Sequence, residues 1–238
     1  MTDTTNFAPN SQAITSDLNF QLKPSGVRSR SYRASILPTN KSTFDPTNTC
    51  ICYIPGGRRN TYLDTNQSYL RITIKNTDPT AANSFRLDNN AASVIQRLDV
   101  YHAGNLLETI QQYNILSTYI FDMQASESNK KGYTNVYGFN NDTNILSTAV
   151  TTASALASTA PTITLDVAAR DRAGMQIFGT SSRTFCLPIF SGVVGVLSDK
   201  MVPLGLLSDD IRLEFTFESN LNAVVSTFAA SIYQIIDF

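Results

Sequence analysis

The clearest alternation of apolar and polar positions lies near the C-terminus, in the segment IRLEFTFE at 211–218. Its apolar positions are Ile211, Leu213, Phe215 and Phe217, and its polar positions are Arg212, Glu214, Thr216 and Glu218. A period of two residues is typical of a strand with one buried and one wet face. The segment 68–76 (SYLRITIKN) repeats the pattern, with Leu70, Ile72 and Ile74 predicted to face inward. These two segments therefore indicate a β-protein.

Further strand-like segments, separated by turn residues, extend this pattern along the chain. We expect strands at 28–37, 50–55, 94–101, 106–110, 162–167, 183–189 and 231–238, with a short turn at 103–105. The segment 112–125 changes to helical spacing and predicts one short helix of about three turns. About eight strands with one short helix and one long surface insertion predict an all-β fold, a single antiparallel eight-stranded jelly-roll β-sandwich.

Two stretches fall outside this strand pattern. Residues 1–27 are polar and aperiodic, which predicts an extended or disordered N-terminal arm. Residues 28–238 would form the jelly-roll domain, with an insertion at about 125–161 on the outer surface. The apolar segment 231–238 has two interpretations: a final strand buried in the sheet, or a point at which a longer polypeptide was cleaved or only partly seen.

Charge is scarce in this chain. Charged residues make up 16% of its 238 residues, against roughly 25% in average soluble domains. The net charge of −1 gives no overall field toward nucleic acid or an anionic membrane. No apolar run of about 18 residues is present and no signal peptide is visible at the N-terminus. We therefore expect no membrane partner.

Candidate catalytic and metal-binding residues are few. Cys50, Cys52 and Cys186 are an odd set, which favours buried apolar residues over a disulfide framework or a zinc site. His102 is the single histidine and lies beside a predicted turn, so no histidine-dependent triad is expected. Asp209-Asp210 precedes a strand and favours a solvated pair over a calcium site. We predict that the chain is not an enzyme and takes no cofactor and no metal.

Two short basic segments are candidates for anion contact. Arg28, Arg30 and Arg33 follow the arm and are the predicted nucleic-acid contacts. They give a weak, non-specific interaction at most, because strong binding requires many neutralised phosphates. The loop 55–60 (PGGRRN) lacks the phosphate-loop patterns and favours a tight turn between strands.

The apolar bridge 189–197 (IFSGVVGVL) joins two predicted strands. Phe190, Val193, Val194 and Leu197 are the predicted assembly interface. The alternative is that the same residues are plain core between the strands.

Three segments carry a resemblance to a known family: LDTNQSYLRITIKN at 63–76, SVIQRLDVYHAGNLLETIQQYNIL at 93–116, and FCLPIFSGVVGVLSDKMVPLGLLSDDIRLEFTFES at 185–219. In these segments the chain resembles the jelly-roll coat proteins of small non-enveloped icosahedral viruses. The resemblance implies an eight-stranded sandwich of two four-stranded sheets. It also implies a virion protein that is assembled in the host cytoplasm or nucleus and contacts a host receptor through surface loops. The arm departs from the pattern, because it is not strongly basic as in many RNA viruses.

The favoured hypothesis is a homo-oligomeric capsid subunit, with many copies forming an icosahedral shell around the genome. Low charge suits such assembly, because few charges need pairing when surfaces are buried between copies. The alternative is a non-catalytic carbohydrate-binding or fibre-type β-sandwich module. The ten tyrosines allow a sugar site, although tryptophan, the strongest platform for a sugar ring, is absent.

Overall fold

The structure is a computed structural model that describes residues 29–81, 83–139, 176–226 and 228–238. The chain divides into two units, 1–35 and 36–238. The described residues of the first unit, 29–35, contain no helix or strand. The sheets and helices below all belong to the second unit. The predicted arm at 1–27 and the predicted strand at 162–167 lie outside the described residues.

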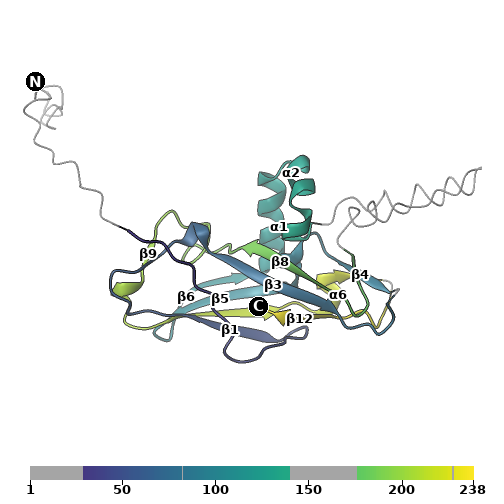
Figure 1. Cartoon of the computed structure of the whole chain (residues 1–238), viewed down its shortest axis with the longest axis horizontal. Helices are drawn as coiled ribbons and strands as arrows, with labels where there is room; N and C mark the ends of the chain where they lie inside the picture. Colours follow the sequence, from purple (N-terminus) through teal and green to yellow (C-terminus); the bar gives the residue numbers. More distant parts are fainter. Residues whose placement is uncertain (1–28, 82, 140–175, 227) are drawn as a thin grey trace, which may run out of the picture. The chain divides into compact units, whose positions relative to one another are not determined.

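Most regular structure is antiparallel sheet (Figure 1). The largest sheet has four strands in the order β1-β10-β5-β6. Their bounds are β1 Thr49–Ile54, β10 Ile211–Phe217, β5 Ile95–His102 and β6 Asn105–Gln111. A second sheet has the order β12-β3-β8, with β12 Tyr233–Asp237, β3 Tyr69–Asn76 and β8 Ser182–Pro188. Phe44 extends this second sheet through an isolated bridge to Ile235.

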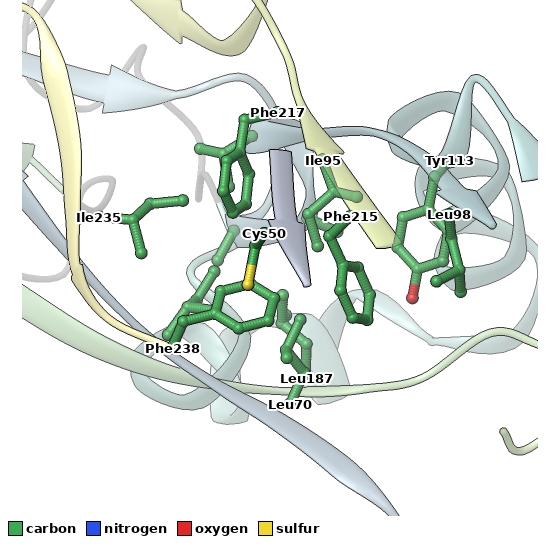
Figure 2. Close-up of a cluster of buried hydrophobic side chains, with 14 of the residues drawn as sticks. Cys50, Leu70, Ile95, Leu98, Tyr113, Leu187, Phe215, Phe217, Ile235 and Phe238 are labelled. Carbon is green, nitrogen blue, oxygen red and sulfur yellow. The ribbon is translucent and has the colours of Figure 1, made fainter. Parts of the chain in front are cut away.

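The core lies where side chains of these two sheets meet. Along β10 buried and half-buried residues alternate, as the sequence pattern predicts. The Phe215 ring lies 5.0 Å from that of Phe238, and the Phe217 ring lies 5.4 Å from that of Phe44. Figure 2 shows Phe215, Phe217 and Phe238 converging in this cluster. Burial of aromatic rings from both sheets is the main apolar contribution here.

Two smaller sheets complete the β-structure. The pair β2 Tyr62–Leu63 and β9 Val202–Pro203 forms one, and the order β11-β4-β7 forms the other. The bounds of the latter strands are β11 Val224–Val225, β4 Ser84–Leu87 and β7 Gln176–Phe178. The described residues therefore contain twelve strands rather than the predicted eight, seven of them at predicted positions and five additional. The additional strands have two to four residues, too few for an alternating pattern to be visible.

Five of the strand pairs are nested, whereas β10–β5, β12–β3 and β11–β4 join strands across this nesting. β5 pairs with β6, and this hairpin is enclosed in turn by the pairs β4–β7, β3–β8, β2–β9 and β1–β10. The Phe44–Ile235 bridge is outermost. The innermost turn is Ala103-Gly104, with φ of 49° and 80°. Positive φ at both central residues characterises the type I′ turn of two-residue hairpins, so the predicted turn is confirmed.

Helices occur mainly between β6 and β7. The predicted helix at 112–125 is confirmed as α1, Tyr113–Gln124. The sequence predicted only this helix, but the described residues form three more short α-helices: α2 Glu127–Gly132, α3 Thr134–Tyr137 and α6 Asn220–Ala223. Short 3₁₀ turns lie at Thr65–Gln67, Ala91–Val94 and Leu204–Leu206. These helices have one or two turns each, too short for an apolar period to be visible in the sequence.

One predicted strand is wrong. Of the strand predicted at 28–37, residues 29–37 are described and form no strand. Their apolar side chains, Tyr32, Ile36 and Leu37, are exposed, so no buried face selects an extended, paired conformation. The described part of the predicted insertion, 125–139, is helical rather than irregular. Its remainder to residue 161 lies outside the described residues.

Candidate functional site

The predicted assembly residues occupy two different environments. Phe190 and Val194 are buried in the core, with 4% and 1% exposed. Val193 is half-buried against the core, whereas Leu197 is 50% exposed. Core packing, the alternative interpretation, therefore accounts for Phe190 and Val194. The assembly role of this bridge remains a prediction that rests on Val193 and Leu197.

A side chain from β6 holds the bridge in place. Ser191 Oγ and the backbone N–H of Gly192 both donate hydrogen bonds to the Glu108 carboxylate. Ser191 Oγ in turn accepts from the N–H groups of Val193 and Val194, both at 3.1 Å. Three consecutive backbone donors are thereby satisfied without a regular element. The bridge is an ordered turn attached to the four-stranded sheet.

Tyr113 at the start of α1 connects the bridge to the helices. Its hydroxyl accepts a hydrogen bond from the Phe190 N–H at 3.0 Å and donates to the Pro188 carbonyl at 3.4 Å. Burial raises the pKa of Tyr113 to about 12. The Phe190 ring also packs edge-on against Phe121 at 5.2 Å, and Phe121 packs on Phe139 at 5.0 Å. Aromatic rings thus bind the helices to the bridge.

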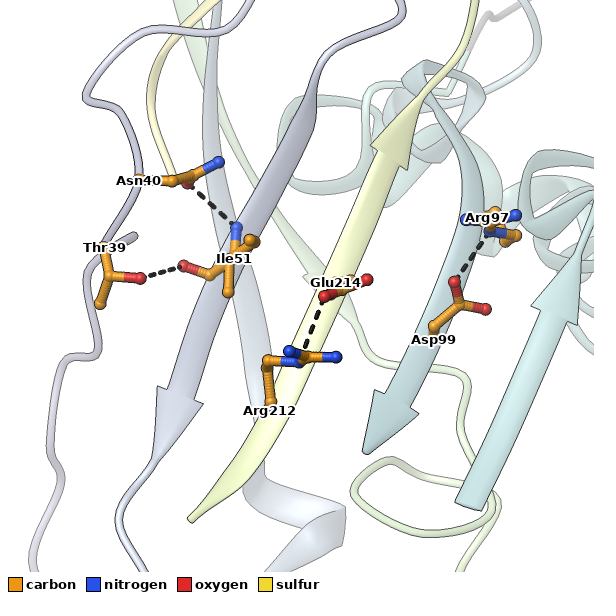
Figure 3. A network of polar contacts seen from close by, with 7 residues as sticks. All are labelled: Thr39, Asn40, Ile51, Arg97, Asp99, Arg212 and Glu214. Atoms are coloured by element: carbon orange, nitrogen blue, oxygen red, sulfur yellow. Dashed lines mark hydrogen bonds and ion pairs between the residues drawn. The ribbon is translucent and has the colours of Figure 1, made fainter. Parts of the chain in front are cut away.

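The outer face of the four-stranded sheet is polar. Arg212 pairs with Glu214 at 3.2 Å, and Arg97 pairs with Asp99 at 2.9 Å (Figure 3). The Arg212 guanidinium also lies 4.3 Å from the centre of the Tyr101 ring, in cation–π geometry. The charges on this face are therefore largely paired with one another.

The outer edge of β1 is covered by residues that precede it. Thr39 N–H donates to the Ile51 carbonyl at 2.9 Å, and the Asn40 side chain accepts from the Ile51 N–H at 3.1 Å. Figure 3 shows Asn40 and the Thr39 side chain flanking this edge. Covering an edge strand prevents unspecific pairing with another chain. At Ile51 the edge of β1 is therefore not open to a further strand.

One end of the four-stranded sheet carries a basic and apolar tip. Here β1 ends and β10 begins, and seven residues on each side, 55–61 and 204–210, separate the β1–β10 pair from the β2–β9 pair. We call Arg58, Arg59, Tyr62 and Leu206 the knob. Leu206 is 85% exposed and Tyr62 63% exposed. A tight turn was predicted at 55–60, and the turn lies at the end of this stretch, where the Thr61 N–H donates to the Arg58 carbonyl at 3.3 Å and Asn60 has a φ of 55°. Gly56 packs against the other loop, where an added Cβ would be 2.2 Å from the Asp209 carbonyl.

The opposite end of the sheet carries a hollow of about 390 Å³. Its lining includes Asp88, Ile115, Glu218, Leu221 and Val225. Figure 1 shows α6 at this end and β9 at the other. The alternation of β10 predicted that Glu218 is wet, and this was wrong, because only 4% of it is exposed.

Neutral donors explain how the Glu218 carboxyl is accommodated. It accepts hydrogen bonds from the Ser219 N–H at 2.9 Å, the Asn222 amide at 3.2 Å and the Asn114 amide at 3.4 Å. Within the described ranges, no cation pairs with Glu218 or with the exposed Asp88. A buried carboxyl without a cationic partner is uncommon in proteins, which makes the hollow a candidate binding site.

The outer side of α1 presents an apolar stripe beside this hollow. Ile115, Tyr119 and Met123 recur every fourth residue and are 62%, 62% and 70% exposed. Such spacing places side chains on one face of a helix. Single exposed apolar residues are ordinary, whereas a row of three is typical of an interaction surface.

The remaining candidates do not converge on a catalytic site. Asp210 accepts from the Gly56 N–H at 2.9 Å, so it stabilises a turn. The Cys50 and Cys52 sulfurs lie 3.8 Å apart in the core, and both residues are buried as predicted, whereas Cys186 is only half-buried. His102 is half-buried at the end of β5. In the described part of the chain no three metal-ligating side chains cluster, and no helix is long and apolar enough to cross a membrane.

The predicted nucleic-acid contacts are only partly described. Arg30 and Arg33 lie in the first unit and are exposed. Arg28 lies outside the described residues. Their role as nucleic-acid contacts remains a prediction.

The hollow was not found from the sequence. Its lining comes from residue 88, from the start of α1 and from 218–225, which are far apart along the chain. The one available signal was Glu218 followed by Ser219 and Asn220, which is typical of a helix start.

No family model matches the chain, and no curated protein matches it. Among solved structures the chain is similar to the quasi-atomic model of the PBCV-1 virus capsid, with 12% identity and a TM-score of 0.35. The match covers 90% of this chain and 44% of that chain, so the present chain spans less than half of its length. A likeness at this TM-score carries no argument about function.

Proposed function

We propose that the chain is a viral capsid subunit that self-assembles in many copies into an icosahedral shell enclosing a genome. The observation that carries this proposal is the strand order. Taking Phe44 as the first strand position, the eight main positions along the chain are Phe44, β1, β3, β5, β6, β8, β10 and β12. Their order in the sheets is first-eighth-third-sixth and second-seventh-fourth-fifth.

That order is the one produced by rolling up a single long antiparallel hairpin into two facing sheets. Double-sheet jelly rolls of this kind occur in viral capsid and lectin domains and in cupins. A cupin-type metal centre has no support in the described residues, where no cluster of ligands occurs. The fold thus favours a binding or structural role, and we propose that the chain is not an enzyme.

Surface composition favours assembly among the remaining roles. Exposed apolar side chains lie on α1, at the knob and around the hollow. The covered edge of β1 and the paired charges of the sheet face leave these surfaces as the candidates for contact between copies. Location in a virion, weak contact with nucleic acid and receptor binding through loops belong to the same proposal.

Electron microscopy of the purified chain tests the proposal. We expect uniform closed particles at some combination of salt and pH. Monomers under every condition would refute it.

A sugar-binding module is the second candidate. A hollow of about 240 Å³ is lined by Tyr53, Tyr101, Asp209, Asp210 and Arg212. Aromatic and polar groups of this kind can hold a sugar ring. However, Arg212 already covers the Tyr101 ring, which leaves Tyr53 as the aromatic platform of this hollow. A glycan array without a binder would exclude this candidate.

A further inference from the structure

We infer that copies of this chain bind head to tail, with the knob of one copy seated in the hollow of the next. The inference rests on the proposed function, because it names the contact through which the subunits would assemble. It is built on described residues of the second unit: 58, 59, 62 and 206 for the knob, and 88, 115, 218, 221 and 225 for the hollow.

The knob is a rigid tip. The Gly57 N–H donates to the Leu204 carbonyl at 2.9 Å, and Tyr62 is in register with Pro203 in the β2–β9 pair. At Gly205 an added Cβ would lie 2.8 Å from the Arg58 carbonyl, so the two loops touch directly. A preorganised tip loses little conformational entropy when it binds.

The knob is also basic and without internal charge pairing. In the portion that the structure describes, neither Arg58 nor Arg59 takes part in an ion pair. Asp209 and Asp210 lie at the same end but line the separate hollow with Arg212. The two arginines are therefore available to a partner.

The hollow has the complementary chemistry. Its lining includes Glu218, a residue of which only 4% is exposed, and the exposed Asp88. Its rim is apolar, with Ile115, Leu221 and Val225 exposed by 62%, 88% and 44%. An arginine fork from the knob would bind the exposed Asp88 carboxylate through two parallel hydrogen bonds and would bring a cation close to the buried Glu218. Tyr62 and Leu206 would then pack on the apolar rim, and the arginine stems would lie along it.

The positions of the two surfaces decide the kind of contact. β10 separates them, and its seven residues rise about 3.3 Å each, so the ends of the strand lie roughly 20 Å apart. The knob and the hollow are different patches at opposite ends of β10, so the contact that we infer between them is head to tail. They make a heterologous contact, which leaves one free knob and one free hollow and closes only in rings or shells.

Complementary variants test this contact by sedimentation velocity. The knob variant is Arg58→Ser with Arg59→Ser, and the hollow variant is Asp88→Arg with Leu221→Arg. All four side chains are exposed. Thermal melts serve to check that each variant still folds. The control Lys41→Ser with Lys75→Ser is matched to the knob variant, because it removes the same two positive charges at other positions.

We expect each variant alone to need at least tenfold more protein than the wild type or the control for assembly. Mixing the two variants should give a species of twice the chain mass of 26.1 kDa and nothing larger. The intact knob of one then enters the intact hollow of the other, and both remaining surfaces are disabled. A mixture that stays monomeric overturns the inference.

Two outcomes separate this contact from the proposed function. If the wild type forms closed particles and both variants assemble equally well, the knob-in-hollow contact is refuted and the shell proposal stands. If the wild type remains monomeric in every buffer, both are refuted.

Discussion

Replacing Tyr113 by phenylalanine isolates the hydroxyl that joins α1 to the apolar bridge. The ring is 1% exposed and keeps its packing, so the change removes one acceptor for the Phe190 N–H and one donor to the Pro188 carbonyl. The contact to Pro188 is long at 3.4 Å and contributes little. Leaving the buried N–H unsatisfied costs about 1–3 kcal/mol of unfolding free energy.

This loss depends on pH in a defined direction. Burial raises the Tyr113 pKa in the folded state to about 12, from about 10 in the unfolded chain. The protonated hydroxyl therefore stabilises the fold fully below pH 10, and its contribution falls as pH rises through about 12. At pH 11 the difference between wild type and variant should be smaller by about 1 kcal/mol than at pH 8.

Urea unfolding followed by circular dichroism measures both quantities. The control is Tyr119→Phe, because Tyr119 is 62% exposed on the same helix and should give no change at either pH. Equal stability of Tyr113→Phe and wild type at pH 8 would refute the bridging role. A difference of the same size at both pH values would refute the argument from burial.

Three further changes have defined outcomes. Gly195→Ala places a Cβ 1.9 Å from the Ile189 carbonyl and should destabilise by at least about 1–3 kcal/mol in thermal melts, whereas Gly192→Ala meets its nearest atom at 3.4 Å and should change the stability little. Ala103→Asn, at φ 49° in the type I′ turn, should raise the unfolding free energy by about 0.5–1 kcal/mol, because asparagine tolerates this conformation; a decrease would contradict the turn assignment. Hydrogen bonds from backbone and side-chain donors lower the Asp78 pKa, so its contribution is present above the unfolded value of about 3.9 and is lost as pH falls through the lower folded value. Asp78→Asn should therefore flatten the fall of the melting temperature below about pH 4, and an unchanged acid profile would exclude this role.

Long alternating strands and one helix could be predicted from the sequence because each carries its own signal. The pattern in β10 and β3 specifies which side faces the core, and the spacing in α1 specifies its three turns. The two-residue pair β2–β9 could not be predicted, because it is set by the register of the longer strands around it. Glu218 was misjudged for a related reason. Its burial depends on Asn114 and Asn222 closing over it, and neither is part of the strand.

The nested pairing of strands also has a kinetic consequence. The β5–β6 hairpin closes through a two-residue turn, so it can form from local contacts alone. Loop closure costs less entropy when the intervening chain is already paired. Each enclosing pair, from β4–β7 outward to Phe44–Ile235, joins ends that the preceding pair has brought together. The β4–β7 pair is the exception, because residues 112–175 lie between β6 and β7 and make this closure long. Once it has formed, the outer pairs need only shorter closures, and we expect mutations in the hairpin turn to slow folding most.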